Sequence, residues 1–354
     1  MQRLLIDQKD ITKTRVEAVE TPGLRAGQAR LKLDRFALTA NNVTYAAAGF
    51  AIGYWKFFPT GIDGQGLVPV WGFADVVESK ADELSVGTRL YGFFPLAESV
   101  VIEPQVTREG MVLDSAAHRA DLPVVYNRYV VSKPRPDKDE GLQALLQPLL
   151  ATSYLLADWL QDNAFFNAEQ VIIGSASSKT GLGLCKFLAE IAQRPVRIVG
   201  LTSKPNVDFV SDLKACDDVL SYDDVTSLPK VPSVYVDMAG NAAVKVALHE
   251  HLAEVLRHSC AVGTSHWDKF TPKLDLKDPK PQFFFAPAQI EKRREDWGPG
   301  VIERQIGEAW RRIALNASDW LDLRSHNGID EAQKVYNALA TWRAVPRDGH
   351  VIAL

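Results

Sequence analysis

The sequence is poor in cysteine and has no long uninterrupted apolar run. Its 354 residues include three cysteines, Cys185, Cys216 and Cys260, and none belongs to a C-x-x-C pair. This odd, unpaired set argues against a disulfide framework and fits a reducing compartment. No segment approaches the roughly 18 apolar residues that a membrane span needs. The opening segment, residues 1–7, meets a charge long before an apolar stretch of signal-peptide length. We therefore expect a cytoplasmic protein with no membrane partner.

An excess of basic residues is also missing. Lys and Arg number 40 against 44 Asp and Glu, for a net charge of -4, and no long basic block occurs. The densest charged cluster, residues 291–296, mixes both signs and is typical of a solvated helix face. Because nucleic-acid binders usually carry a basic face, we expect no nucleic-acid partner.

The sequence lacks the residues that two kinds of catalytic site need. The only histidine in the first 160 residues is His118, and no cysteine precedes Cys185. A catalytic zinc site needs several such ligands, so we predict none. The G-x-S-x-G motif of serine hydrolases does not occur either.

The hydrophobic fraction of 46% supports an ordinary globular core, and the length suggests two domains. The first 135 or so residues predict a β-rich domain with irregularly spaced strands. Its short apolar runs are Ala29–Leu33, Val68–Val77, Arg89–Phe94 and Tyr126–Val131. A proline-rich break at residues 133–137 follows.

After this break the pattern changes to alternating helices and strands. Helices are predicted at Leu142–Asp162, Thr180–Gln193, Val207–Lys214 and Asp330–Trp342. Strands are predicted at Val171–Ile173, Val196–Leu201, Asp218–Tyr222, Ser233–Met238, Ala261–Gly263, Gln282–Phe285 and at the C-terminus. Such alternation indicates an α/β fold with a parallel sheet. We expect the terminal strand to return to the N-terminal domain.

The turn after the first of these strands is the most informative segment. Ser175, Ala176, Ser177, Ser178, Lys179, Thr180 and Gly181 lead from a buried strand into a helix. Small side chains let the backbone approach a pyrophosphate, and the helix N-terminus offers free N–H groups. A P-loop would need glycines where Ile173 and Ser178 stand, so that interpretation fails. The remaining alternative is a tight strand–helix turn with no ligand.

The end of the second strand bears on the choice of cofactor. An NAD site usually has Asp or Glu there to hold the ribose 2′-hydroxyl. This chain has Thr202, Ser203 and Lys204, and no acid occurs from Val196 to Asn206. Hydroxyls and a cation suit a 2′-phosphate, so we predict NADPH over NADH; an exposed polar turn is the alternative.

These features resemble the medium-chain dehydrogenase/reductase superfamily, in particular its zinc-independent quinone-oxidoreductase-like members. The strongest resemblance is to a branch that is defined as a domain of unknown function. The motifs that carry it are residues 40–46, 53–59, 70–74, 90–95, 118–119, 126–129 and 175–180. They extend over nearly the whole chain.

The resemblance implies a GroES-like β-rich domain plus a Rossmann doubly wound parallel sheet. The expected boundaries are 1–137 for the GroES-like substrate domain, 138–314 for the Rossmann NADPH-binding domain, and 315–354 for the return to the GroES-like domain. It also implies a homodimer. Further cofactor-binding residues that it implies are Tyr222, Ala239, Gly240, Gly263, Thr264, Phe284 and Phe285.

The chain departs from the family at the N-x-x-D motif. Its sequence there is Asn41-Asn42-Val43-Thr44, with Thr44 in place of the acid. Tyr45, Asn41 and Asn42 are the predicted catalytic donors; alternatively the asparagines form a turn and Tyr45 packs. The segment from Phe94 to Val125 is longer than the superfamily predicts and is expected to form a lid or a substrate wall.

Aromatic residues are the candidates for a substrate pocket. Tyr54, Trp55, Phe57 and Tyr126 would line it, although they could equally fill the small domain's core. His118 fits a structural role better than a catalytic one. The favoured function is NADPH-dependent reduction of a carbonyl, a quinone or an activated C=C bond of a small apolar molecule. The alternative is a non-catalytic NADPH-binding protein that senses redox state or binds a partner.

Overall fold

The computed structural model describes residues 1–263 and 276–354, and it divides the chain into two compact units. The first unit comprises Met1–Leu145 together with Leu321–Leu354, and the second comprises Leu146–Trp320. Helix α2 (Asp137–Asp162) contains the boundary between them. Among the described helices, none is both long and apolar enough to cross a bilayer.

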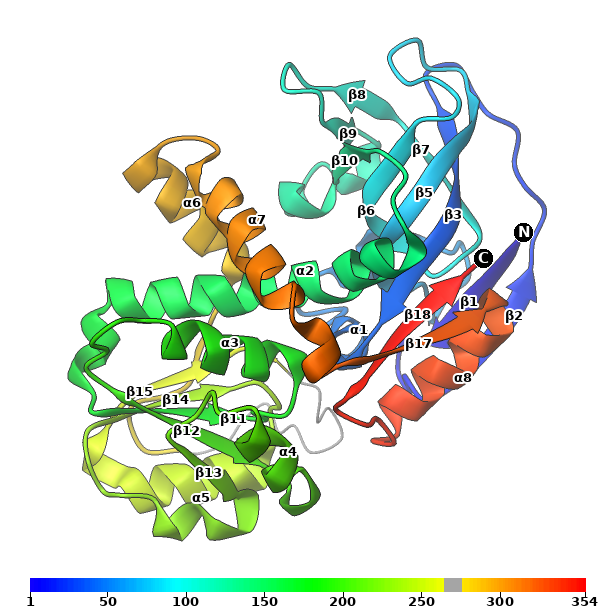
Figure 1. The fold of residues 1–354 in the computed structure, drawn as a ribbon. Coiled ribbons are helices and arrows are strands. Elements are labelled where there is room, and N and C mark those ends of the chain that lie inside the picture. The colour runs from blue at the N-terminus through cyan, green and yellow to red at the C-terminus, as the bar shows by residue number, and fades with distance from the viewer. Residues whose placement is uncertain (264–275) are drawn as a thin grey trace. The chain divides into compact units, whose positions relative to one another are not determined.

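The first unit is built mainly from antiparallel strands (Figure 1). A nine-stranded sheet has the order β17-β18-β3-β5-β6-β10-β9-β8, with β7 paired to β3, and a small sheet has the order β2-β1-β4. The strands are β1 (Gln2–Asp7), β2 (Thr14–Ala18), β3 (Ala29–Leu38), β4 (Gln65–Gly66), β5 (Pro69–Ser79), β6 (Arg89–Pro95), β7 (Ser99–Ile102), β8 (Pro104–Val106), β9 (Val112–Asp114), β10 (Arg128–Ser132), β17 (Asp322–Asn327) and β18 (Asp348–Ala353).

The strands of this unit differ in detail from the predicted runs. Strand β6 is buried at every position, as its unbroken apolar run indicates. The predicted strand Tyr126–Val131 begins two residues too early, because Tyr126 belongs to the 3-10 turn η3 (Val124–Tyr126). Strand β17 was not predicted; its polar sequence shows no alternation.

The C-terminal residues complete the first unit. Strand β18 pairs antiparallel with β3, and β17 lies parallel to β18. The helix between them, α8 (Gly328–Ala340), buries its apolar residues at helical spacing. The chain terminus is therefore part of the same sheet as β3.

The segment from Phe94 to Val125 adds strands β7, β8 and β9 to the first unit. It is held by a buried ion pair, in which Arg119 Nε lies 3.1 Å from Asp114 Oδ2. The Arg119 guanidinium also lies 4.5 Å from the ring centre of Phe58. Because a charge this deeply buried needs a partner, the pair fixes the segment against the aromatic residues beneath it.

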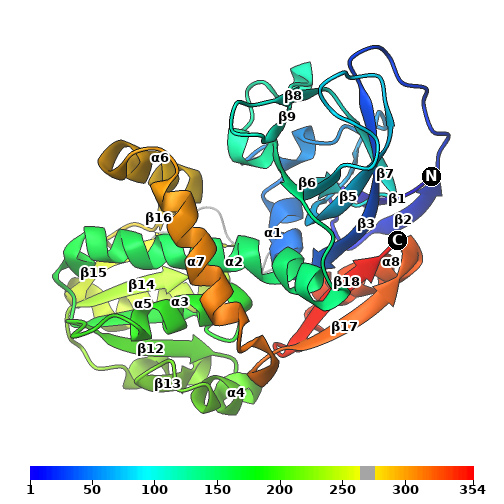
Figure 2. The same ribbon diagram turned by 45° about the horizontal axis from the view of Figure 1, so that its top comes forward.

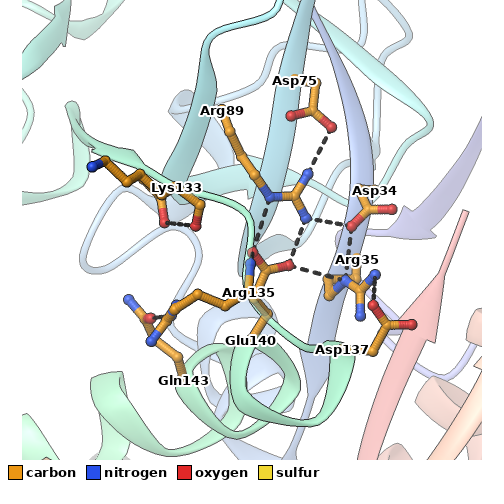
Figure 3. A network of polar contacts seen from close by, with 10 residues as sticks. Asp34, Arg35, Asp75, Arg89, Lys133, Arg135, Asp137, Glu140 and Gln143 are labelled. Atoms are coloured by element: carbon orange, nitrogen blue, oxygen red, sulfur yellow. Dashed lines mark hydrogen bonds and ion pairs between the residues drawn. The ribbon is translucent and has the colours of Figure 1, made fainter.

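A second buried charge network ties the start of α2 to three strands (Figure 3). Arg89 of β6 donates to both carboxylate oxygens of Glu140 at 3.0 and 2.6 Å. It also contacts Asp34 of β3 at 2.5 Å and Asp75 of β5 at 2.7 Å. Arg35 lies 3.4 Å from Glu140 on another side. These carboxylates keep the pKa of Arg89 well above its ordinary value despite burial.

The second unit contains a six-stranded, all-parallel sheet in the order β13-β12-β11-β14-β15-β16. Its strands are β11 (Gln170–Gly174), β12 (Arg197–Thr202), β13 (Asp218–Ser221), β14 (Ser233–Asp237), β15 (Leu256–Ala261) and β16 (Gln282–Phe283). This order confirms the predicted parallel α/β architecture. The strand order reverses between β11 and β14, where parallel sheets bind ligands.

Helices α2, α3 (Lys179–Ala189), α4 (Val207–Asp212) and α5 (Ala242–Leu252) flank this sheet (Figures 1 and 2). Helices α6 (Ala286–Trp297) and α7 (Val301–Ala314) follow β16 and bond to α2, through Arg293 to Asp158 and Gln305 to Tyr154. Val244, Leu248 and Leu252 of α5 pack with Ile172 and Val199 in one core cluster. On the opposite face, Gly200 lies against Ala176 and Val210 of α4.

The predicted strand Ala261–Gly263 is wrong, because β15 ends at Ala261 rather than beginning there. The buried polar residues His258 and Ser259 hide this strand from an apolar pattern. The predicted strand Gln282–Phe285 is shorter than expected and ends at Phe283.

Candidate functional site

The turn between β11 and α3 has the geometry of a phosphate-binding loop. Ser175 has a positive φ of 55°, and the Ala176 N–H donates to Leu201 O of β12 at 2.9 Å. Ser178 caps α3, since its hydroxyl accepts from the Gly181 N–H at 3.1 Å. The loop is therefore held by bonds at both ends before any ligand binds.

Gly181 is required by this loop. A Cβ atom there would overlap the carbonyl oxygen of Ser175. Among the described residues, none accepts from the backbone N–H groups of Ser177 or Thr180. Free N–H groups at a helix N-terminus, beside a backbone without side-chain obstruction, are what a pyrophosphate needs. Ser153 of α2 donates to Thr180 O at 2.7 Å and so holds the helix start.

The end of β12 is bonded to the same loop. The Thr202 hydroxyl, 1% exposed, lies 2.9 Å from Ser177 Oγ. Asn206 Nδ2 donates to Ser203 Oγ at 3.0 Å and to Ser177 Oγ at 3.4 Å. Lys204 is exposed at the start of the turn η5 (Lys204–Asn206). Thr202 thus supports the loop, whereas Ser203, Lys204 and Asn206 lie nearer the surface.

Asn206 was missed by sequence reasoning. Its position two residues after Lys204 gave no motif, and only the fold brings its amide to Ser177.

Tyr222 lies in the turn η6 (Tyr222–Ser227), directly after β13. Burial raises the pKa of its hydroxyl to about 12, and hydrogen bonding with Ser175 opposes that rise. The structure therefore brings this predicted residue to the loop after β11.

The end of β14 carries a buried ion pair that sequence reasoning also missed. Asp237 Oδ1 accepts from the N–H groups of Ala239 and Gly240 at 3.1 and 2.9 Å. Its other oxygen lies 3.0 Å from Lys245 Nζ of α5. Gly240 has a φ of 74°, which favours glycine. Asp237 and Lys245 therefore set the path of the loop that holds Ala239 and Gly240.

The other predicted cofactor residues are less uniform. A Cβ atom at Gly263 would overlap Met238 O, so the loop after β15 passes close to the loop after β14. Phe284 donates its N–H to Ala261 O at 2.8 Å, while its ring lies 5.6 Å from that of Trp159 in the core. Phe285 precedes α6 without a side-chain cap. Thr264 lies outside the described residues.

In the first unit, the predicted catalytic segment forms the helix α1 (Ala40–Ala47). Asn42 belongs to its capping box, because Asn42 Oδ1 accepts from the Thr39 N–H at 2.8 Å. Asn42 Nδ2 donates to Pro69 O at 2.8 Å, and the residue is buried. Its amide is thus bonded on both sides to the protein, whereas Asn41 is half-buried.

Tyr45 lies one turn further along α1, within a cluster of aromatic rings. Its hydroxyl oxygen accepts from Trp71 Nε1 at 3.3 Å. Its ring centre lies 4.6 Å from that of Tyr54 and 5.5 Å from that of Phe93. Burial holds the pKa of Tyr45 well above its ordinary value, although hydrogen bonds from Trp71 and Asn41 oppose the rise. The hydroxyl is therefore neutral and able to donate across the working pH range.

The four predicted pocket residues separate into two kinds. Tyr54, Phe57 and Tyr126 lie in the cluster around Phe93. Trp55, from the turn η1 (Tyr54–Lys56), instead packs its indole against Gly49 and Gly66, where a Cβ atom would overlap the ring. We conclude that Trp55 has a packing role.

Two further predictions concern His118 and metal binding. His118 Nε2 lies 3.2 Å from Phe57 O, as expected for a structural histidine. Within residues 1–263 and 276–354, no group of three or more His, Cys, Asp or Glu side chains could hold a metal ion.

A β-rich antiparallel unit together with a six-stranded parallel sheet defines the fold of the medium-chain dehydrogenase/reductase superfamily. Solved structures with this fold match the whole chain. CurA from Vibrio vulnificus in complex with NADPH has 10% identity and a TM-score of 0.67, over 100% of this chain and 99% of that one. The YhdH oxidoreductase from Salmonella enterica in complex with NADP has 13% identity and a TM-score of 0.53, over all of both chains.

A quinone oxidoreductase from Coxiella burnetii has 15% identity and a TM-score of 0.53, over 100% of this chain and 99% of that one. At this identity the likeness shows the fold. The chain belongs to the family DUF2855, described as a protein of unknown function, whose model matches residues 36–344. The expected resemblance to a branch defined as a domain of unknown function is therefore confirmed, and the solved structures show the fold that the resemblance implied. No curated protein matches the chain in sequence.

Proposed function

We propose that the second unit binds NADPH. The observation that carries this proposal is the turn from Ser175 to Gly181, whose geometry admits a pyrophosphate and excludes a Cβ at Gly181. Ser203, Lys204 and Asn206 would present two polar groups and a cation to a 2′-phosphate, and no acid occurs from Val196 to Asn206. Relatives of the same fold, CurA and YhdH, were solved with NADPH and NADP.

The proposed reaction is reduction of a carbonyl, a quinone or an activated C=C bond in a small apolar molecule, without zinc. Bound NADPH supplies a hydride. This chain must supply an apolar surface for the substrate and a hydrogen-bond donor for the oxygen that gains charge. The aromatic cluster of Tyr45, Tyr54, Trp71, Phe93 and Tyr126 offers both. We also propose that the protein is a homodimer.

The bonds already described support this proposal, because they order the loops that would position the cofactor. Thr202 and Asn206 fix Ser177, while Ser178 fixes Gly181, so the pyrophosphate loop is ordered in advance. Asp237 and Lys245 order the loop after β14 in the same way. Preorganised donors of this kind avoid an entropic cost on binding.

The second candidate is a non-catalytic NADPH-binding protein. Two observations favour it: Thr44 replaces the acid of the N-x-x-D motif, and Asn42 is fully engaged as a helix cap. Such a protein would keep the loop after β11 and need no donor to a substrate.

One experiment separates the candidates. Calorimetry would first measure NADPH binding by the full chain, and NADPH oxidation would then be followed with quinones, aldehydes and aryl enones. Turnover with any of these supports the reductase, and binding without turnover supports the second candidate. Absence of NADPH binding would overturn both. A matched control, Gly181→Val, should abolish binding and turnover together.

A further inference from the structure

Two tyrosine hydroxyls from separate parts of the first unit lie within hydrogen-bond distance. Tyr54 comes from η1 and Tyr126 from η3, and their oxygens are 3.1 Å apart. Their rings meet edge to face, with centres 5.7 Å apart. Tyr54 is only 6% exposed, whereas Tyr126 is half-buried. Tyr126 is thus the member of the pair that a molecule from solvent can touch.

Either hydroxyl of the pair can donate to the other at this distance. Because Tyr126 is the more exposed member, the arrangement that would serve a substrate is the one in which the Tyr54 O–H donates to the Tyr126 oxygen. The Tyr126 proton then remains available for another acceptor, and a donated bond makes that proton a stronger donor.

Tyr45 is less accessible for the same task. Its hydroxyl oxygen also accepts a hydrogen bond, from the Trp71 indole, but the residue is only 6% exposed. Around Tyr126, by contrast, the rings of Phe93 and Trp71 lie at 4.7 and 6.2 Å between ring centres, and Trp71 is half-buried. The half-buried rings of Trp71 and Tyr126, above the buried ring of Phe93 and with the Tyr126 hydroxyl at their edge, suit a flat conjugated molecule with a carbonyl oxygen.

We propose that Tyr126, supported by Tyr54, is the residue that hydrogen-bonds and protonates the oxygen of a flat conjugated carbonyl substrate. This assignment rests on the proposed reductase function. When the substrate gains a hydride from NADPH, the carbonyl π pair moves onto its oxygen. The Tyr126 O–H bond breaks, and that proton forms the new O–H bond of the product. The Tyr54 proton then passes to the Tyr126 oxygen, and one proton from solvent, which enters the pair at the more exposed Tyr126, restores both hydroxyls.

The first test measures donation at equilibrium, without NADPH. The full chain would be titrated with para-nitrophenolate, a flat aromatic anion whose oxygen imitates the charged substrate oxygen. We expect Tyr126→Phe to weaken binding by about tenfold or more, because only the donor is lost. Tyr129→Phe is the matched control, since the Tyr129 hydroxyl already donates to Phe93 O at 3.2 Å. It should leave binding unchanged.

Equal affinity in the wild type and Tyr126→Phe would overturn the assignment, as would absence of binding by a folded wild type. Melting temperatures of all variants would be measured in parallel, to separate loss of a donor from loss of the fold.

The second test uses turnover with benzylideneacetone and phenanthrenequinone. Tyr126→Phe should lower kcat by roughly 10²-fold, with NADPH affinity unchanged. Tyr54 is a positioning residue, so Tyr54→Phe should lower kcat by less than Tyr126→Phe does. The double variant should be no slower than Tyr126→Phe. Independent, additive losses would overturn the relay. If the wild type binds NADPH but reduces no probe, the reductase function fails, and the nitrophenolate titration still decides the role of Tyr126.

Discussion

The hydroxyl of Thr202 lies 2.9 Å from the hydroxyl of Ser177, which joins the end of β12 to the loop after β11. Both groups are buried, so the bond is retained whatever occupies the surface beside them. The same loop accepts a weaker bond from Asn206. In the proposed NADPH site, discrimination between NADPH and NADH would therefore depend on the more exposed neighbours, above all Lys204.

The first prediction concerns this cofactor choice. NADPH should bind at least about tenfold more tightly than NADH, a difference of about 1.4 kcal/mol. Lys204→Ala should narrow that gap by weakening NADPH alone, because its cation faces the additional phosphate. Calorimetry with both nucleotides measures the effect, and Lys230→Ala, another exposed lysine of the same unit, is the control. Equal affinities in the wild type would contradict the prediction.

The second prediction concerns Gly181. In Gly181→Ala the added Cβ overlaps Ser175 O, so the loop must move away from its bonded position. We expect NADPH affinity to fall by at least about tenfold. Gly307→Ala on α7 is the matched control, because its Cβ would meet only the flexible end of Arg311, at 3.4 Å. That variant should keep its affinity; retention of wild-type affinity by Gly181→Ala would show that the loop is not the phosphate site.

The sequence was sufficient for the parallel sheet and for the turn after β11. Both depend on local signals, namely short apolar runs and a cluster of small residues before a helix. Two of the strands that escaped prediction lack such a signal: β17 is polar, and β15 buries His258 and Ser259.

The site residues that escaped prediction act through long-range contacts. Lys245 reaches Asp237 from the next helix, and Asn206, in the turn after β12, reaches Ser177 in the loop after the neighbouring strand β11. Trp55 and Tyr126 were placed in one pocket because composition alone cannot separate a ring that packs on glycine from a ring beside a hydroxyl. Only the folded chain shows that Trp55 is buried and that Tyr126 is partly exposed.

The third prediction concerns Tyr45, the donor that the sequence favoured. If Tyr45 contacts substrate, Tyr45→Phe lowers kcat by roughly 10²-fold and leaves NADPH affinity near that of the wild type. The opposite result, unchanged turnover with a stability loss of about 1 kcal/mol, would mean that the hydroxyl serves only Trp71. Melting temperature and kcat measured on the same variant decide between them.

The fourth prediction concerns metal. The first unit brings no set of histidine, cysteine or acidic side chains together as a metal site in its described residues. Purified protein should therefore contain no stoichiometric zinc, and a chelator should leave NADPH oxidation intact. Elemental analysis that finds one zinc per chain would refute this.

The fifth prediction concerns the buried network at Arg89 (Figure 3). Glu140 is 1% exposed and accepts two bonds from Arg89, so its charge has been removed from water. Breaking such a pair typically costs about 3–5 kcal/mol, because the remaining charge stays buried. In Glu140→Gln, Arg89 keeps Asp34 and Asp75, and the loss should lie at the lower end of that range.

Arg89→Met should cost more than Glu140→Gln, because it leaves Glu140 with Arg35 at 3.4 Å and deprives Asp34 and Asp75 of their shared cation. Arg312→Met provides the control: its pair with Glu190 is exposed, and such pairs contribute about 1 kcal/mol or less. In thermal unfolding, Arg89→Met should therefore have the lowest melting temperature. Glu140→Gln should melt at a higher temperature, and Arg312→Met at a clearly higher temperature than either. If Arg312→Met lost as much stability as Arg89→Met, burial would not be what makes this network important. Because the network lies in the first unit, NADPH affinity at the loop after β11 should remain unchanged in the folded Arg89→Met and Glu140→Gln variants.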